Sequence, residues 1–80
     1  LIEKEELAEY EELIRRLYEA ISSLPPMQAR HVHARYMLGM KVKDIAAMEG
    51  ITPSQAGKSI HAALRRLRRY FARQKWTVNL

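Results

Sequence analysis

The 80-residue sequence contains no cysteine, only three glycines and three prolines, and no acidic residue after Glu49. The absence of cysteine excludes disulfides and thiolate metal sites, so a core of this size must rest on helix packing or on a partner. No apolar run approaches the ~18 residues that a membrane span requires, and no charged-then-apolar leader opens the chain. A chain this short buries only about 60 to 65% of its unfolded surface, which excludes a multi-domain enzyme. We therefore expect one cytoplasmic domain over residues 1–80 that does not enter a membrane.

The charge that is present is unevenly distributed. Residues 1–20 hold seven acids and three bases, whereas residues 21–80 hold two acids and eleven bases, for a net charge of +5 overall. A polyanion would be repelled by the first segment and attracted to the last, which is typical of a nucleic-acid binder with a non-binding appendage. The alternative is a solvated basic face without a partner.

The residue pattern predicts an all-α fold, because Ala, Leu, Glu, Arg and Met dominate and no window alternates apolar and polar residues. Residues 1–24 form an acidic amphipathic helix, whose apolar residues recur at steps of three and four: Leu7, Tyr10, Ile14, Leu17, Ile21 and Leu24. Pro25 and Pro26 end this helix and begin the next one. The second helix runs from about Pro26 to Leu38, with Gly39 as its C-terminal cap.

Residues 26–73 carry the predicted DNA-binding portion, and residues 74–80 form a tail without an assignable pattern. A short third helix spans Val42–Glu49 and stops at Gly50. The fourth helix is capped by Thr52, has Pro53 in its first turn and reaches about Phe71 or Arg73. A short helix, a glycine-containing turn and a longer basic helix make a helix-turn-helix. We expect Ile45 and Met48 to point inward, Ala46 to permit close helix crossing and Ile51 to fill the turn.

Winding the fourth helix at ~100° per residue separates two faces. The apolar face, which we expect to form the core, consists of Ala56, Ile60, Ala63, Leu64, Leu67 and Phe71. The opposite face carries Lys58, Arg65 and Arg69, flanked by Ser54, Gln55, His61 and Ala62. A helix with an apolar face that packs on the domain and a basic face that points away from it has the pattern of a recognition helix.

The N-terminal turns of such a helix reach base edges, and the remainder follows the backbone. Gln55 can pair with adenine and Lys58 with guanine, while Ser54 is less selective. Free backbone N–H groups near Thr52 offer a phosphate site. We assign phosphate contacts to Lys41, Lys43, Arg65, Arg66, Arg68 and Arg69, with solvated surface arginines as an equal alternative for Arg66 and Arg68. With about six phosphates neutralised, log affinity falls with log salt at a slope near −5.

Other chemistries find little support. His31 and His33 lie two residues apart, so on a helix they point in different directions and cannot jointly hold a metal. No serine-histidine-acid spacing occurs, and we expect no catalysis and no cofactor. The first helix has two interpretations: a two-stranded coil that makes a homodimer, or a helix folded back over the helix-turn-helix. We prefer the second, because Leu13 and Tyr18 widen the apolar face beyond a narrow seam.

The stretch from Tyr18 to Tyr70 resembles region 4 of sigma-70-type RNA polymerase sigma factors, the domain that recognises the promoter −35 element. The matching pieces are Leu24-Pro25-Pro26, Arg35-Tyr36, Gly39, Asp44-Ile45-Ala46, Gly50-Ile51-Thr52, Ser59-Ile60-His61-Ala62-Ala63-Leu64 and Arg65-Arg66-Leu67-Arg68. The resemblance implies a four-helix domain whose last helix enters the major groove of double-stranded DNA, with Ser54, Gln55 and Lys58 facing the bases. It also implies packing on the flap of the polymerase beta subunit.

The sequence departs from the family at four positions. His31 and His33 replace apolar residues, and Ala56-Gly57 replaces a β-branched residue followed by a basic one. Nothing in the chain resembles the family's region 2, which melts the −10 element. The resemblance therefore implies either the C-terminal fragment of a sigma factor or a free-standing regulator of transcription initiation. The rival hypothesis is a protein-interaction module that contacts polymerase or a regulator without reading DNA sequence.

Overall fold

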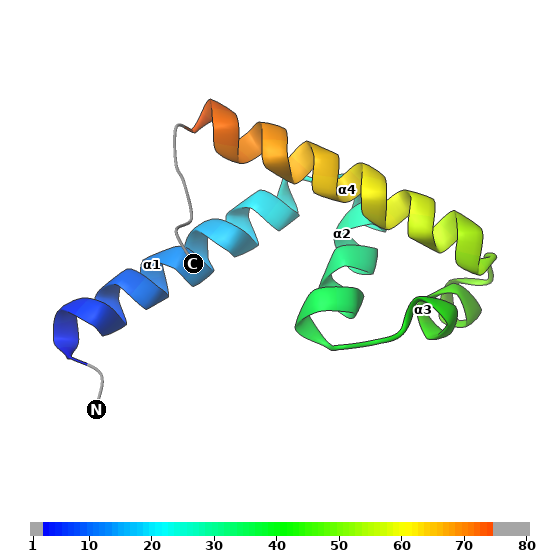
Figure 1. Ribbon diagram of the computed structural model, residues 1–80, viewed down its shortest axis with the longest axis horizontal. Coiled ribbons are helices and arrows are strands. Elements are labelled where there is room, and N and C mark those ends of the chain that lie inside the picture. Colours follow the sequence, from blue (N-terminus) through cyan, green and yellow to red (C-terminus); the bar gives the residue numbers. More distant parts are fainter. Residues whose placement is uncertain (1–2, 75–80) are drawn as a thin grey trace.

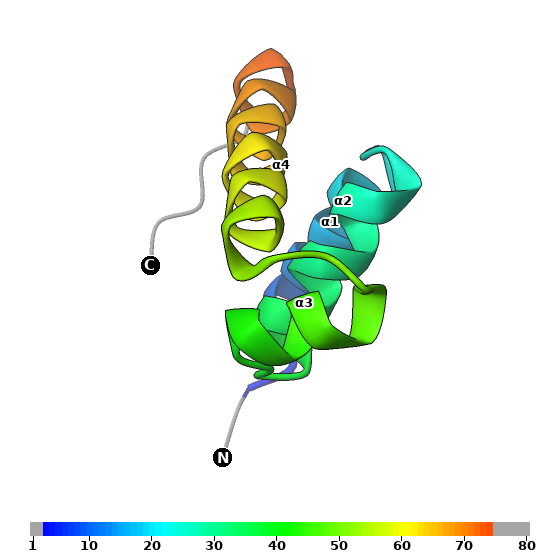
Figure 2. The ribbon, with the colours of Figure 1, turned by 90° about the vertical axis from the view of Figure 1, so that its right-hand side faces the viewer.

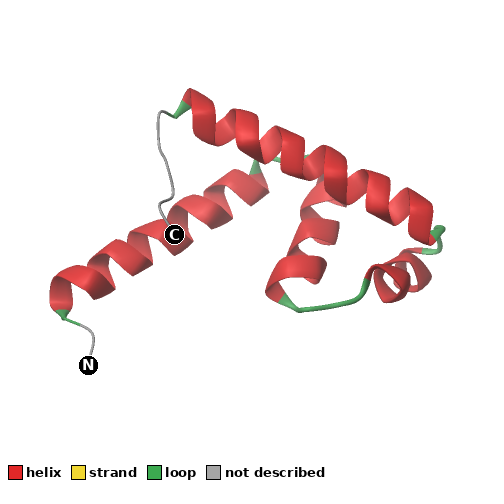
Figure 3. Ribbon diagram, in the orientation of Figure 1, coloured by secondary structure: helices red, strands yellow, loops and turns green. Residues whose placement is uncertain are grey.

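The computed structural model describes residues 3–74, and within this range it contains helices and no strand (Figure 3). The elements are α1 (Lys4–Ser22), α2 (Pro26–Val32), the π-helix η1 (His33–Met37), α3 (Val42–Glu49) and α4 (Pro53–Arg73). The predicted four-helix, all-α domain is thereby confirmed. No helix in the described range is long and apolar enough to cross a membrane.

The longest helix, α4, organises the other elements (Figure 1). Both α2 and α3 pack against α4, and a view turned by 90° shows α4 standing along one side of them (Figure 2). Ala63 and Leu67 of α4 belong to a cluster with Ala20, Ile21, Leu24 and Val32 from the first two helices. Ile60, one turn earlier on α4, packs in a second cluster with Ala34 and Ile45. One face of α4 therefore ties the N-terminal helices to the helix-turn-helix.

The turn between α1 and α2 forms where the two prolines predict it. Pro26 occupies the first turn of α2, and the N–H of Ala29 donates to the carbonyl of Pro25 at 2.9 Å. The last carbonyls of α1 are satisfied locally: Ser23 Oγ donates to the Ala20 carbonyl at 2.6 Å, and Ser22 Oγ donates to the Glu19 carbonyl at 2.8 Å. The chain reverses here without leaving these helix ends unpaired.

The second helix differs from the single α-helix that the sequence predicts between Pro26 and Leu38. From His33 to Met37 it continues as a π-helix, and the N–H of Leu38 donates to the carbonyl of His33 at 3.1 Å. This wider turn ends at Gly39, which has a φ of +69°, so the predicted cap residue is correct. Each hydrogen bond of a π-helix spans five residues, whereas each one of an α-helix spans four. A search for apolar residues at a spacing of 3.6 residues cannot detect this single wider turn.

Only the second half of α1 folds back on the domain. Leu17 packs against the first cluster, and Ala20 and Ile21 are buried in it. Leu7 and Tyr10, however, are 45% and 59% exposed, and Figure 1 shows the first turns of α1 extending away from the other helices. The expectation that α1 packs over the core is therefore correct near its C-terminus and wrong for its first half.

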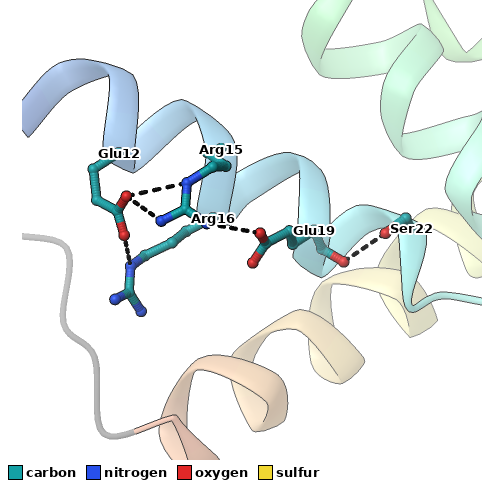
Figure 4. Close-up of polar contacts among 5 residues, drawn as sticks. All are labelled: Glu12, Arg15, Arg16, Glu19 and Ser22. Carbon is teal, nitrogen blue, oxygen red and sulfur yellow. Dashed lines mark hydrogen bonds and ion pairs between the residues drawn. The ribbon is translucent and has the colours of Figure 1, made fainter. Parts of the chain in front are cut away.

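The middle of α1 carries a short charge network of its own (Figure 4). Glu12 accepts from Arg15 and, at 2.7 Å, from Arg16 Nε, while Arg15 also reaches Glu19 at 3.1 Å. Hydrogen bonds from Arg15 and Arg16 lower the pKa of the Glu12 carboxyl below its ordinary value. Two of the three bases in residues 1–20 are thus paired with acids of the same helix.

Candidate nucleic-acid interface

The turn between α3 and α4 is closed by backbone hydrogen bonds. Gly50 has a φ of +70°, in the left-handed region that favours glycine. The N–H of Ile51 donates to the Ala46 carbonyl at 3.0 Å, and the N–H of Gly50 donates to the Ala47 carbonyl at 3.3 Å. This pairing satisfies the last carbonyls of α3 and fixes the direction in which the chain enters α4.

The first turn of α4 carries a reciprocal capping box. Thr52 Oγ1 accepts from the N–H of Gln55 at 3.1 Å, and Gln55 Oε1 accepts from the N–H of Thr52 at 2.9 Å. Thr52 is the cap that the sequence predicts. Its partner Gln55 was not predicted, although the spacing T-x-x-Q is the signature of this motif.

The capping box changes what this end of α4 can offer to DNA. The N–H groups of Thr52 and Gln55 are occupied and Pro53 has none, so Ser54 provides the remaining N–H of the turn. The phosphate site expected from free N–H groups near Thr52 is therefore reduced to one donor. Gln55 is exposed, but its amide oxygen is engaged by the backbone. Pairing with adenine, which uses that oxygen, requires the side chain to leave the capping box.

The two faces of α4 separate as the sequence predicts. Ala56, Ile60, Ala63 and Leu67 are 0 to 8% exposed, and Leu64 and Phe71 pack at the edge of the clusters. The residues expected to face DNA are all exposed: Thr52, Ser54, Gln55, Lys58, His61, Arg65, Arg66, Arg68 and Arg69. No carboxylate lies on α4, so the exposed face of this helix carries only basic and neutral side chains.

Lys41 and Lys43 lie on another element, at the beginning of α3. Lys41 precedes its first turn and Lys43 lies within that turn, and both side chains are exposed. Asp44, the neighbouring acid, stands in the first turn, where a negative charge is favourable to the helix dipole. These two lysines therefore form a separate basic group at the start of α3.

The buried face of α3 differs by one residue from the expected one. Ile45 and Ala46 are buried as predicted, but Met48 is 64% exposed. The face follows positions 42, 45, 46 and 49, which recur at steps of three and four residues, and it ends with Glu49 in place of Met48. Glu49 accepts from Arg30 Nε at 3.0 Å and from the Arg30 Nη2 at 3.3 Å. Glu49 can therefore occupy the last position of this buried face, because Arg30 of α2 is its counter-ion.

His31 connects three helices at this point. It is fully buried, its Nδ1 lies 2.8 Å from Ser59 Oγ of α4, and its Nε2 lies 3.5 Å from Glu49 Oε1 without forming a hydrogen bond. A proton on Nε2 favours the approach to the carboxylate, and the Ser59 hydroxyl then donates to Nδ1. From the sequence, His31 is expected not to bind a metal together with His33, and no role in the core is predicted for it. His33, in contrast, is half-buried at the start of η1.

The surroundings of Glu49 stabilise its ionised form. The hydrogen bond from Arg30 is the main cause that lowers the pKa of this carboxyl below its ordinary value, and His31 contributes in the same direction. The three-helix junction behind the exposed face of α4 is therefore held by a buried histidine and an ionised glutamate.

The family comparison agrees with this geometry. The family described as "Sigma-70, region 4" matches residues 14–67, which is more than half of the chain. The chain belongs to the sigma-70 region 4 family. Comparisons with the curated proteins and with the solved structures gave no match.

Membership agrees with the elements that the structure forms. The matched range of this region 4 domain begins in the middle of α1 and ends at Leu67, inside α4, so that it includes α3, the turn and the larger part of α4. The first turns of α1, which extend from the domain, lie before the match. Region 4 is a non-enzymatic, DNA-binding domain of transcription proteins, and the exposed basic face of α4 is the surface of this chain suited to that role.

Proposed function

We propose that this region 4 domain binds double-stranded DNA sequence-specifically in transcription initiation or its regulation, either within a sigma factor or as a free-standing regulator. The observation that carries the proposal is the division of α4 into a buried apolar face and an exposed basic face without acids. A helix held in this way by α2 and α3 can enter the major groove without disturbing its own core.

The reading residues lie in the first turns of α4. Lys58 is the strongest candidate, because it is exposed on the centre of the basic face and can donate to guanine O6 and N7. Ser54 contributes a less selective hydroxyl. Gln55 reads adenine only in the fraction of complexes in which it leaves the capping box, so we propose a secondary role for it.

The phosphate contacts extend on both sides of the reading turns. We propose Lys41 and Lys43 at the start of α3, and Arg65, Arg66, Arg68 and Arg69 along α4, with His61 and Thr52 at the edge of the face. About six neutralised phosphates give a slope of log affinity against log salt near −5. Binding is then steeply weakened by added salt.

Two alanine variants test the reading role. Lys58→Ala and Lys43→Ala remove the same charge, one from the centre of the basic face of α4 and one from α3. Selection from a randomised duplex library should show that Lys58→Ala loses affinity by about 1–3 kcal/mol and changes the preferred base. Lys43→Ala should weaken all sequences alike. An unchanged preference in Lys58→Ala would refute the assignment of α4 as the recognition helix.

A second candidate function is a protein-interaction module. It is supported by four large apolar side chains that are 49 to 64% exposed on the other helices or directly after η1: Met27, Tyr36, Leu38 and Met48. The flap of the RNA polymerase beta subunit is the partner that we propose for the domain. Retained binding of a purified flap domain together with equal affinity for all duplex sequences would favour this function over DNA reading.

The exposed first half of α1 supports a homodimer as a further proposal. Leu7 and Tyr10 leave an apolar strip of α1 without a cover among the described residues. A dimer requires a palindromic DNA site, whereas a monomer reads one asymmetric element. Sedimentation of the wild type and of Leu7→Asp distinguishes the two: a dimer that the substitution dissociates supports the proposal, and a monomeric wild type contradicts it.

A further inference from the structure

A basic hollow lies outside the face that we propose for reading bases. It has a volume of about 390 Å³ and lies between the C-terminal end of α1 and the second half of α4. Its walls are Ser23, Leu24, Arg66, Arg69, Tyr70 and Arg73. The four residues from α4 follow the spacing of one helix flank, so their side chains share one side of the helix. This volume is within the usual range of small-molecule sites.

Among the described residues, the three arginines of the hollow have no counter-ion. Among residues 3–74, Arg66, Arg69 and Arg73 form no ion pair and no side-chain hydrogen bond, in contrast to Arg15 and Arg30. All three are exposed, and no acid follows Glu49 in the chain. Three like charges within two helical turns repel each other, and a bound anion relieves this repulsion.

The hollow offers donors and few acceptors. Each guanidinium presents several N–H groups in a fork that matches two oxygens of one anion. The Ser23 hydroxyl does not add a donor for an anion, because it already donates to the Ala20 carbonyl at 2.6 Å. Tyr70 packs against the first core cluster and meets Phe71 edge to face, with ring centroids 5.5 Å apart. Its ring is therefore held by packing at the wall of the hollow.

Capping of α1 does not explain these arginines. The C-terminal end of α1 has no basic residue in its last turn, and cations are favourable there. The last carbonyls nevertheless have partners: those of Glu19 and Ala20 accept from the N–H of Ser23 and from the Ser22 and Ser23 hydroxyls, and that of Ile21 accepts from the N–H of Leu24. No arginine of the hollow is bonded to them.

We propose that this hollow is a phosphate-binding site. Arg69 belongs both to the hollow and to the basic face of α4, and it lies roughly 16 Å along the helix from Lys58. A phosphate offers several oxygens to the three forks and carries more charge than a single carboxylate. Two sources provide this group: a backbone phosphate of the DNA bound on α4, or a free phosphorylated nucleotide. The proposal goes beyond the proposed function, since the free protein binds phosphate whether or not it reads sequence.

The test uses the whole chain with inorganic phosphate as the probe. Side-chain Nε–Hε signals of the arginines are followed by NMR during the titration, in the wild type and in two variants with equal charge. Arg73→Gln removes one wall of the hollow, and Lys4→Gln removes an exposed base from the first turn of α1, at the opposite end of that helix from the hollow. Circular dichroism verifies that both variants remain helical.

We expect saturable shifts at Arg66, Arg69 and Arg73, with affinity about tenfold weaker in Arg73→Gln and nearly unchanged in Lys4→Gln. Shifts that do not saturate, or equal losses in both variants, would overturn the proposal, as would tighter binding of a hexaglutamate peptide than of phosphate. Displacement of phosphate by a random-sequence duplex supports the proposal and indicates that the native ligand is a backbone phosphate of DNA. Displacement by a nucleoside triphosphate and not by the duplex also supports the proposal and indicates that the native ligand is a free nucleotide.

Discussion

The hydrogen bond between His31 and Ser59 allows a quantitative test of the junction behind α4. Substitution Ser59→Ala removes the only atom that pairs with His31 Nδ1, which lies at 2.8 Å. Because His31 is fully buried, its ring nitrogen is then left without a partner in the core. Such a loss costs about 1–3 kcal/mol of the free energy of unfolding. Ser59 itself is only half-buried, so water near the new methyl group favours the lower half of this range.

The double variant His31→Leu/Ser59→Ala separates the cost of the unpaired nitrogen from the value of the bond. It removes both polar groups, and an apolar side chain fills the space between α2 and α4, so we expect it to be more stable than Ser59→Ala alone. The two substitutions should therefore be non-additive, with a coupling energy of about 1–2 kcal/mol. His31→Leu alone should lie between the two, because its serine retains access to water.

Urea and thermal unfolding followed by circular dichroism measure these changes. For a domain of this size, the loss in Ser59→Ala corresponds to a decrease in Tm of about 5–20 °C. Ser54→Ala is the matched control, because Ser54 is exposed on the same helix and should change the free energy by less than about 0.5 kcal/mol. Equal stabilities of Ser59→Ala and wild type, or simple additivity in the double variant, would refute the role that we assign to His31.

Three further predictions concern the core, the cap and the acid side of the stability curve. Ile60→Asp places an unpaired charge at a site that is 5% exposed and should unfold the domain; cooperative melting of this variant would contradict the face assignment. Thr52→Ala removes the capping box with Gln55 and should cost about 1 kcal/mol in urea unfolding. The pKa of Glu49 lies below its ordinary value of 4.5 because of Arg30. Its stabilisation is therefore present above that value and is lost as the pH falls through the folded pKa, and Glu49→Gln should show a smaller acid loss.

The sequence was sufficient for the elements whose signals are local. Thr52 followed by Pro53 predicts the first residue of α4, and Gly50 predicts the last turn of α3, because caps and left-handed turns depend on residues close in sequence. The faces of α4 follow in the same way from its spacing of apolar residues. These features agree with the structure to within a residue.

The features that the sequence analysis missed depend on contacts between helices. Met48 and Glu49 are adjacent, and spacing alone favours the apolar residue for the core. The structure instead turns Glu49 inward, because Arg30, nineteen residues earlier, provides the opposite charge. His31 likewise has a use only when Ser59 of α4 is placed beside it. The exposure of the first half of α1 could not be predicted either, since an amphipathic pattern does not indicate which partner covers its apolar face.

The division of charge between α1 and α4 has a structural consequence. Arg15 and Arg16 neutralise acids of their own helix, and no ion pair joins the acids of α1 to the arginines of α4 among the described residues. The basic face of α4 is therefore not covered by the acidic segment, and DNA meets it without displacing an internal partner. With 19 residues, α1 is roughly 28 Å long. Its first turns lie more than one Debye length of ~8 Å from its own last turn, where it meets α4, so the acids there repel DNA weakly at physiological salt. We therefore expect the acidic helix to disfavour DNA contact with its first turns at low salt and to contribute little to affinity at higher salt.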